Sequence, residues 1–310
     1  MSGIDRVHHF HNAAVAPGVT EQPLLFECDG EQLLGVLAYA QQPRDCGVLI
    51  IVGGPQYRAG SHRQFVLLAR RLASAGYSNL RFDYRGMGDS SGSPRDFRHV
   101  GADIEAAVNA FRMAVPQLKR IVLFGLCDAA SAALMYGIDL EPVAGMVLIN
   151  PWVRDDVSLA RAQVKHYYTA RLTNPAFWRK LLGGEVDYRA TGAGLAHRLR
   201  TALSGQRGGE SPDADFQSAM ARGLGRFERP VLLILSGKDL TAQEFRDYAA
   251  GHCAWRGLLD VQHVTRIDVS DADHTFSRQA WRVQVESELL AWLQKHYAGA
   301  PGATAERVAC

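Results

Sequence analysis

A cysteine stands between a predicted strand and a predicted helix. Residues 121–124 form a short apolar run, and residues 128–136 are rich in alanine, which favours a strand followed by a helix. Gly125 lies two residues before Cys127 and Ala129 two residues after it. Small residues at both positions are typical of the sharp turn that exposes a catalytic nucleophile. We therefore expect Cys127 to be a nucleophile whose thiolate is favoured by the start of the helix.

Cys127 and Asp128 each have an alternative interpretation. An isolated cysteine after a strand is usually a buried core residue, but the small residues around Cys127 favour catalysis. The backbone N–H of Asp128 would point at a developing oxyanion. The Asp128 carboxylate would oppose a thiolate beside it, whereas a helix start is a favourable place for an acid. We take capping of the helix as the role of this carboxylate.

A histidine occupies the position expected for a general base. His274 follows the predicted strand 264–269 and precedes the final predicted helix, 279–296. In a hydrolase with a nucleophile at a strand-to-helix turn, the histidine comes last along the chain. It would take the proton of the nucleophile and later deliver a proton to the leaving group.

An aspartate directly after a buried strand completes the set. Asp239 follows residues 231–235 and could orient the imidazole of His274. It could instead cap the helix that begins near Thr241. Three other acids rival it because they lie close to His274 in the sequence: Asp268, Asp271 and Asp273. Asp239 is preferred because it gives the order nucleophile, acid, base.

Two glycine-containing segments follow other predicted strands. Gly53 and Gly54 come after residues 48–52, where a backbone N–H could be the second oxyanion donor. Pro55 has no N–H, which leaves Gly54 or Gln56. The segment FDYRGMGDS at 82–90 contains neither GK[ST] nor GxGxxG. It therefore predicts a structural loop that supports the oxyanion region, not a nucleotide site.

The elements around these residues alternate between strands and helices, which predicts βαβ units and a mainly parallel sheet. Residues 26–28 and 33–39 flank Asp29-Gly30 and predict an antiparallel hairpin at one edge. The remaining expected strands are 48–52, 78–82, 121–124, 144–149, 231–235 and 264–269, and the expected helices include 62–75, 103–115, 128–136 and 279–296.

The alternation is lost between residues 152 and 228, where the sequence has helical character, several aromatic residues and a Gly/Ser-rich stretch. We predict a core made of 1–151 and 229–297, a helical lid or cap at 152–228, and a disordered tail at 298–310.

Composition excludes several classes of protein. The 310 residues are 47% hydrophobic and 21% charged with a net charge of +2, which gives no basic surface for nucleic acid. No apolar run is long enough to span a membrane. The five cysteines are widely spaced, which favours a reduced, cytoplasmic protein without a metal site or other cofactor. The oligomeric state does not follow from the sequence.

Taken together, these segments resemble the α/β-hydrolase superfamily over nearly the whole chain. The matching motifs are Gly53-Gly54, FDYRGMGDS at 82–90, GLCDA at 125–129, SGKD at 236–239 and ADHTF at 272–276. The resemblance implies an eight-stranded, mostly parallel sheet with a lid after the sixth strand, and Cys127, Asp239 and His274 as the triad. A cysteine nucleophile departs from the usual serine and is similar to that of dienelactone hydrolases and polyhydroxyalkanoate synthases. Val52 replaces the histidine that often precedes the oxyanion glycine.

A narrower likeness is to the exosortase A system-associated hydrolases of type one. It is carried by GGPQYRAGSHRQF at 53–65, GLCDAASA at 125–132 and NPW at 150–152, and it implies a bacterial protein linked to exopolysaccharide and protein sorting. The expected activity is hydrolysis of a carboxylic ester or thioester through an acyl-cysteine intermediate. The expected partner is therefore a small-molecule acyl substrate. Acyl transfer to an alcohol or amine is the alternative, and a non-catalytic binding or redox-sensing role is a third.

Overall fold

The structure, a computed structural model, describes residues 19–54, 56–154 and 214–298. The chain divides into two compact units, Met1–Trp152 with Ser218–Cys310, and Val153–Gln217. Most of the predicted cap, 152–228, and of the predicted tail, 298–310, lies outside the described residues. The described part of the predicted cap contains one helix, α7 (Ala214–Arg226), as the helical character of the sequence there predicts.

A single sheet of eight strands organises the described residues, and its strand order is β1-β2-β4-β3-β5-β6-β7-β8. The strands are β1 (Val19–Cys28), β2 (Glu31–Ala40), β3 (Cys46–Ile51), β4 (Asn79–Phe82), β5 (Arg120–Leu126), β6 (Val143–Ile149), β7 (Val231–Ser236) and β8 (Val264–Val269). Strands β4, β3, β5, β6, β7 and β8 run parallel to one another, whereas β1 and β2 form an antiparallel hairpin. Strand β2 joins the hairpin to the sheet by antiparallel pairing with β4. The expected hairpin and mostly parallel sheet are confirmed.

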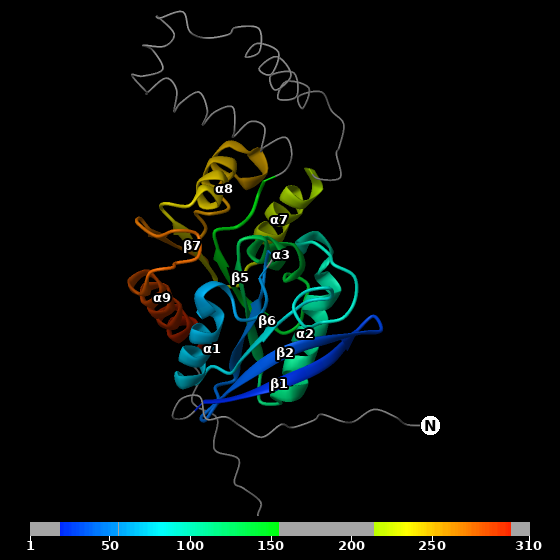
Figure 1. Cartoon of the computed structure of the whole chain (residues 1–310). Helices are drawn as coiled ribbons and strands as arrows, with labels where there is room; N and C mark the ends of the chain where they lie inside the picture. Colours follow the sequence, from blue (N-terminus) through cyan, green and yellow to red (C-terminus); the bar gives the residue numbers. More distant parts are fainter. Residues whose placement is uncertain (1–18, 55, 155–213, 299–310) are drawn as a thin grey trace, which may run out of the picture. The chain divides into compact units, whose positions relative to one another are not determined.

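Helices cover both faces of the sheet. They are α1 (Gln64–Ser74), α2 (Gly101–Ala114), α3 (Asp128–Tyr136), α8 (Leu240–Gly251) and α9 (Gln279–Tyr297), together with α7. Helices α1 and α9 lie on one side of the sheet, and α2 and α3 lie on the other (Figure 1). This arrangement follows from right-handed crossovers between parallel strands, which place successive helices on one face or the other.

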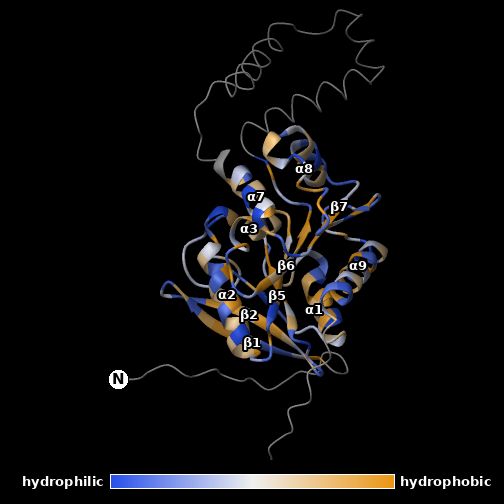
Figure 2. Cartoon of the chain, turned by 180° about the vertical axis from the view of Figure 1, so that it is seen from behind, coloured by the Kyte–Doolittle hydropathy of each residue, from blue (hydrophilic) through white to orange (hydrophobic). Residues whose placement is uncertain are grey.

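The core is apolar on the face that meets α1 and α9. Alternate residues of the central strands, such as Val48, Ile50 and Phe124, pack there against Leu72 of α1 and Leu293 of α9, and all five are buried. The hydropathy colouring shows the central strands as mainly hydrophobic, while hydrophilic residues lie on the outer sides of the helices (Figure 2). The fully buried parallel strands explain why their sequences are continuous apolar runs without alternation.

Helix α1 begins later than the sequence predicts. The expected helix starts at residue 62, but His62 and Arg63 have positive φ angles of 52° and 60°. They belong to a 3₁₀ turn, Ser61–Arg63, and the regular helix starts at Gln64. Apolar spacing fixes which residues face the core, but it does not detect a left-handed turn ahead of the first apolar residue.

The loop after β4 is tied to α2 by a buried ion pair. The Arg85 guanidinium donates to both carboxylate oxygens of Asp103, at 3.1 and 2.9 Å, and the Arg85 backbone N–H donates to the same carboxylate at 2.8 Å. Asp103 is fully buried and Arg85 is 6% exposed. Removal of one partner from such a pair leaves the other charge buried without compensation.

We expect Asp103→Ala to lower the free energy of unfolding by about 3–5 kcal/mol. Asp29 is a matched control, because it pairs with the same guanidinium at 2.6 Å while its side chain is 67% exposed. Asp29→Asn should cost less than about 1 kcal/mol, because asparagine removes the charge and tolerates the positive φ of 49° at this turn position. Urea denaturation of the two variants checks this, and equal losses would show that burial does not set the strength of the Asp103 contact.

Candidate active site

The residues singled out by the sequence follow neighbouring strands at one edge of the sheet. Cys127 follows β5, Asp239 follows β7, and His274 follows β8. These strands run parallel in the order β5-β6-β7-β8, so their carboxyl ends lie side by side. The Gly53-Gly54 segment follows β3, the neighbour of β5 on the other side. In open α/β sheets this edge is where ligands bind.

Cys127 occupies a strained turn between β5 and α3. Its φ and ψ angles are 63° and −125°, a conformation that a residue with a side chain rarely adopts. The Cys127 N–H donates to the Ile149 carbonyl at 2.8 Å, which anchors the turn to the end of β6. A Cβ added at Gly125 would lie 2.5 Å from the Ala129 carbonyl. This close approach is the steric reason for the small residues that flank Cys127.

The other described cysteines lie in different settings. Cys46 is completely buried in β3, and burial raises the pKa of its thiol to about 12. Burial also raises the pKa of Cys28, at the end of β1. Cys253 is exposed, in a short 3₁₀ turn. Among the described cysteines, Cys127 alone combines partial exposure with a helix start.

Asp239 and His274 are in direct contact. The Nδ1 atom of His274 lies 2.8 Å from Oδ2 of Asp239. The same carboxylate accepts the backbone N–H groups of Thr241 and Ala242, each at 3.1 Å, and so caps α8. The capping and catalytic interpretations of Asp239 are therefore compatible. The three rival acids have other partners, namely Arg266 for Asp268, Lys238 for Asp271 and Ser277 for Asp273.

Asn150 and Ser236 hold the histidine loop, and the sequence reasoning did not assign them this role. The Asn150 side-chain amide donates to Ser236 Oγ at 2.9 Å and to the His274 carbonyl at 3.2 Å. Ser236 Oγ donates in turn to the Asp273 carbonyl at 3.0 Å. Both side chains are fully buried. In the sequence, Asn150 and Ser236 could have been found as polar residues that follow buried apolar runs, the same pattern that indicated Asp239.

The Gly53-Gly54 turn meets the start of α3 through the Asp128 side chain. The Gly54 N–H donates to Asp128 Oδ2 at 2.8 Å, and the Ala129 N–H donates to Asp128 Oδ1 at 2.9 Å. A Cβ at Gly53 would lie 2.0 Å from Asp128 Oδ1 and 2.8 Å from the backbone nitrogen of Ala129, so only glycine fits there. The carboxylate does bind a free N–H at the helix start, as expected. It also takes the Gly54 N–H that the sequence offered as an oxyanion donor.

Burial governs the charge of Asp128. It raises the pKa of this carboxyl, against the opposing effect of N–H groups from Gly54, Ala129 and Asp128 itself and of the nearby His274 charge. The backbone N–H of Gln56 was the other candidate donor after β3. The Gln56 side-chain oxygen accepts the Ser61 N–H at 3.1 Å.

The comparison with known proteins identifies the family of this chain. The profile of the alpha/beta hydrolase family matches residues 48–284, which include the turn at Gly53-Gly54, Cys127, Asp239 and His274. The chain belongs to the alpha/beta hydrolase family. No curated protein matches it.

Solved structures share the α/β-hydrolase fold at low sequence identity. The esterase Pf2001 of Pyrococcus furiosus is 16% identical with a TM-score of 0.61, and the match covers 90% of this chain and 93% of that one. The hydrolase GrgF of Penicillium sp. sh18 is 17% identical with a TM-score of 0.58, covering 90% and 100%. An esterase domain from Rhodothermus marinus is 19% identical with a TM-score of 0.56, also covering 90% and 100%. At these identities the likeness shows the fold alone.

A second loop of this α/β-hydrolase braces the segment after β3. Asp83, fully buried after β4, accepts the Arg58 backbone N–H at 2.6 Å and forms an ion pair with the Arg58 guanidinium. Arg58 also pairs with Asp89 at 2.5 Å. These contacts agree with the interpretation of FDYRGMGDS as a structural loop.

Neither a metal-binding cluster nor a membrane span is found where the structure is described. No group of three His, Cys, Asp or Glu side chains there could hold a metal ion. No helix of the described ranges is both long and apolar enough to cross a bilayer.

Proposed function

We propose that this α/β-hydrolase cleaves carboxylic esters or thioesters with Cys127 as nucleophile, His274 as general base and acid, and Asp239 as the acid that orients the imidazole. The observation that carries the proposal is the 2.8 Å contact between His274 and Asp239. It lies at the same sheet edge as the strained turn that holds Cys127. A nucleophile, a base and an orienting acid in this order support covalent acyl transfer chemistry.

The reaction has two steps. His274 takes the proton of the Cys127 thiol, and Cys127 Sγ attacks the substrate carbonyl carbon. The bond to the leaving alcohol or thiol then breaks as His274 gives that proton to the leaving group. Water then attacks the acyl-cysteine carbonyl, its proton passes to His274, and the carboxylic acid is released as the Cys127 thiol is restored. Asp239 stabilises the imidazolium formed in both steps, because its carboxylate is held in place by two backbone N–H groups of α8.

The Asp128 carboxylate has to yield its position before an oxyanion can bind. The Gly54 N–H, one of the proposed oxyanion donors, already donates to this carboxylate. A second anion cannot share that donor at low cost, because like charges repel strongly in a partly buried site. The site is therefore competent when Asp128 is protonated or when its side chain turns away from Gly54.

We expect Asp128→Asn to raise kcat/KM for an activated ester by about 10-fold near pH 8, because the neutral amide does not repel an oxyanion. Burial raises the pKa of Asp128, so the inhibitory ionised form is lost as pH falls through that pKa. The gain from Asp128→Asn should consequently shrink toward low pH. Profiles of kcat/KM against pH for both proteins measure this.

Asp139→Asn is the matched control, because Asp139 is a surface acid with a 73% exposed side chain. It should leave the profile unchanged. A loss of activity in Asp128→Asn at every pH would show that the carboxylate itself is needed for the reaction.

Hydrolysis and acyl transfer are distinguished by the fate of the acyl group. We would measure products from p-nitrophenyl esters and acyl-CoA thioesters, with and without added alcohols and amines. Release of free acid at a rate independent of the acceptor supports the proposed hydrolase. Product formation that depends on the acceptor would instead make the chain an acyltransferase, and no turnover on any substrate would favour a binding or redox-sensing role.

We further propose that the chain is of the exosortase A system-associated type and acts on a small acyl substrate in the cytoplasm. The motifs at 53–65, 125–132 and 150–152 support the subtype, and the cysteine usage supports a reducing compartment. Loss of exopolysaccharide in a strain that carries only the Cys127→Ala protein would support this assignment.

A further inference from the structure

The short segment that follows β6 binds both the nucleophile turn and the histidine loop. The Ile149 carbonyl accepts the Cys127 N–H at 2.8 Å, and the Trp152 N–H donates to the Cys127 carbonyl at 3.3 Å. Between these two backbone contacts lies Asn150, whose side-chain amide donates to the His274 carbonyl at 3.2 Å. The backbone of this segment is therefore fixed to the nucleophile, while its side-chain amide is fixed to the loop that carries the base.

The Asn150 side chain also joins a buried hydrogen-bond network. Its Oδ1 accepts the Ser236 N–H at 2.8 Å, and its Nδ2 donates to Ser236 Oγ at 2.9 Å. Ser236 Oγ donates in turn to the carbonyl of Asp273, the residue before His274. Asn150 and Ser236 are fully buried, so water does not compete for these directional bonds. The network thus holds two consecutive carbonyls of the histidine loop.

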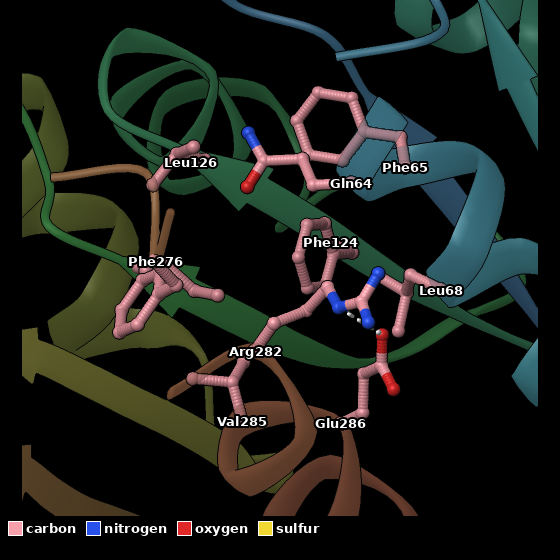
Figure 3. Close-up of a pocket in the computed structure, with 10 residues that line it drawn as sticks. Gln64, Phe65, Leu68, Phe124, Leu126, Phe276, Arg282, Val285 and Glu286 are labelled. Atoms are coloured by element: carbon pink, nitrogen blue, oxygen red, sulfur yellow. Dashed lines mark ion pairs between the residues drawn. The ribbon is translucent and has the colours of Figure 1, made fainter. Parts of the chain in front are cut away.

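Apolar packing alone does not fix the direction of the histidine. Phe276, two residues after His274, belongs to the same buried cluster as Leu126 at the end of β5. Both side chains also line a small hollow in the described part of the chain, which leaves their packing incomplete on that side (Figure 3). Hydrophobic contact has no direction, and a void removes contacts. Orientation has to come from hydrogen bonds, which Asp239 makes to the ring and Asn150 to the backbone.

The backbone at Asn150 suits asparagine or glycine. Its φ angle is 46°, in the left-handed region that asparagine adopts more readily than most residues with a side chain. Its N–H donates to the Ile234 carbonyl of β7 at 3.1 Å. Glycine adopts the same conformation without strain. Asn150→Gly therefore removes the amide while the backbone can keep its course.

We propose that Asn150 is a positioning residue that holds the His274 imidazole where it can exchange a proton with Cys127. The inference rests on the proposed function, because it concerns the base of the same reaction. Asp239 binds Nδ1 of the ring, whereas Asn150 binds the backbone from which the ring projects. Since the segment of Asn150 is also bound to the Cys127 turn, it relates the position of the base to that of the nucleophile.

Asn150→Gly is expected to lower kcat/KM for a p-nitrophenyl ester by about 10²-fold, the effect of a displacement of about 1 Å in a reacting group. The loss should be larger for an alkyl ester of the same acid, because a poor leaving group needs the proton of a well-placed His274. Steady-state kinetics with both esters measure this, and thermal denaturation verifies that the variant is folded.

A double-mutant cycle with His274→Ala distinguishes positioning from a structural role. A residue that acts through His274 has no further effect on catalysis once the imidazole is absent. Asn150→Gly combined with His274→Ala should therefore have the same kcat/KM as His274→Ala alone. A second loss of about 10²-fold in that background would overturn the inference.

Ser236→Ala is a milder variant of the same network. It removes the hydroxyl that accepts from Asn150 and donates to the Asp273 carbonyl, but the Asn150 contact with His274 is kept. We expect a loss of about 5-fold in kcat/KM, which corresponds to one hydrogen bond of about 1 kcal/mol. This loss should also disappear in the His274→Ala background. The variant keeps the inference testable if Asn150→Gly does not fold.

Asn79→Ala is the matched control. Asn79 is also fully buried, and its amide also donates to two acceptors, the carbonyls of Ala69 and Tyr77 at 2.8 and 3.2 Å. It lies at the amino end of β4, away from the edge that carries the candidate site. The variant should be less stable but should keep the wild-type ratio of kcat/KM for the two esters. An equal change of this ratio in the Asn79 and Asn150 variants would contradict a specific role of Asn150.

Proton NMR of the ring N–H that His274 directs at Asp239 separates failure of the inference from failure of the proposed function. This signal requires no turnover. We expect it to shift or to exchange faster with water in Asn150→Gly and to stay unchanged in Asn79→Ala. A changed signal in a protein that turns over no ester would support the positioning of His274 and reject the reaction. An unchanged signal in Asn150→Gly would overturn the inference, whether or not the protein hydrolyses esters.

Discussion

Replacement of His274 by alanine is expected to lower kcat/KM for an activated ester by about 10³-fold or more. The variant lacks both the base for Cys127 and the acid for the leaving group. Asp239 stays buried in it, because the carboxylate is still bound by the N–H groups of Thr241 and Ala242. The measurement is steady-state kinetics with esters of matched acyl chain and different leaving groups.

The leaving-group series adds a readout that a merely structural role of His274 would not change. Poor leaving groups need the proton from His274, so the loss of rate should be larger for an alkyl ester than for a p-nitrophenyl ester. His252→Ala is the control, since His252 is exposed, caps the short turn at Cys253 and stacks on Tyr248. An equal loss in the two histidine variants would contradict the assignment of His274 as general base and acid.

Asp239→Asn is expected to lower kcat by about 10⁴-fold with a smaller loss of unfolding free energy than Asp239→Ala. The asparagine oxygen can still accept one of the two N–H groups at the start of α8, so the cap is kept in part. The neutral amide does not stabilise an imidazolium and favours the wrong tautomer of His274. Activity and stability are thereby separated at one residue that serves both.

Asp239→Ala completes this comparison. It removes the cap as well, so we expect a similar loss of activity together with a loss of about 0.5–2 kcal/mol of stability. Asp268→Asn is the control among the rival acids, because Asp268 pairs with Arg266 on the surface. Kinetics and thermal denaturation of the three variants measure both effects, and full activity in Asp239→Asn would remove Asp239 from the triad.

The position of the candidate site could be predicted because its residues come after the carboxyl ends of predicted strands. Apolar runs at 121–124 and 231–235 locate β5 and β7, the β-branched segment at 264–269 locates β8, and each is followed by a candidate residue. Parallel strands bring such residues to one edge, so Asp239 and His274, 35 residues apart, could be expected to meet. The hairpin at Asp29-Gly30 was predictable for a local reason, the turn chemistry of those two residues.

Contacts that depend on side-chain direction could not be predicted. The Asp128 carboxylate reaches Gly54 across 74 residues of sequence, and a helix-start aspartate gives no sign of such a partner. The Asn150–Ser236 hydrogen bond joins two strand ends that are 86 residues apart. The ion pair of Arg282 and Glu286 looks in the sequence like an ordinary i,i+4 pair on a helix surface, whereas Glu286 is buried.

The central claim is that Cys127 forms a covalent bond with the acyl group, and intact-protein mass spectrometry after a short pulse of ester or thioester tests it most directly. The background is Cys253→Ser, because Cys253 is exposed and could be acylated without catalysis. We predict one acyl adduct, located at Cys127, that decays as free acid appears and that forms more slowly in His274→Ala. An adduct that remains in Cys127→Ala, or turnover that survives that substitution, would contradict the account.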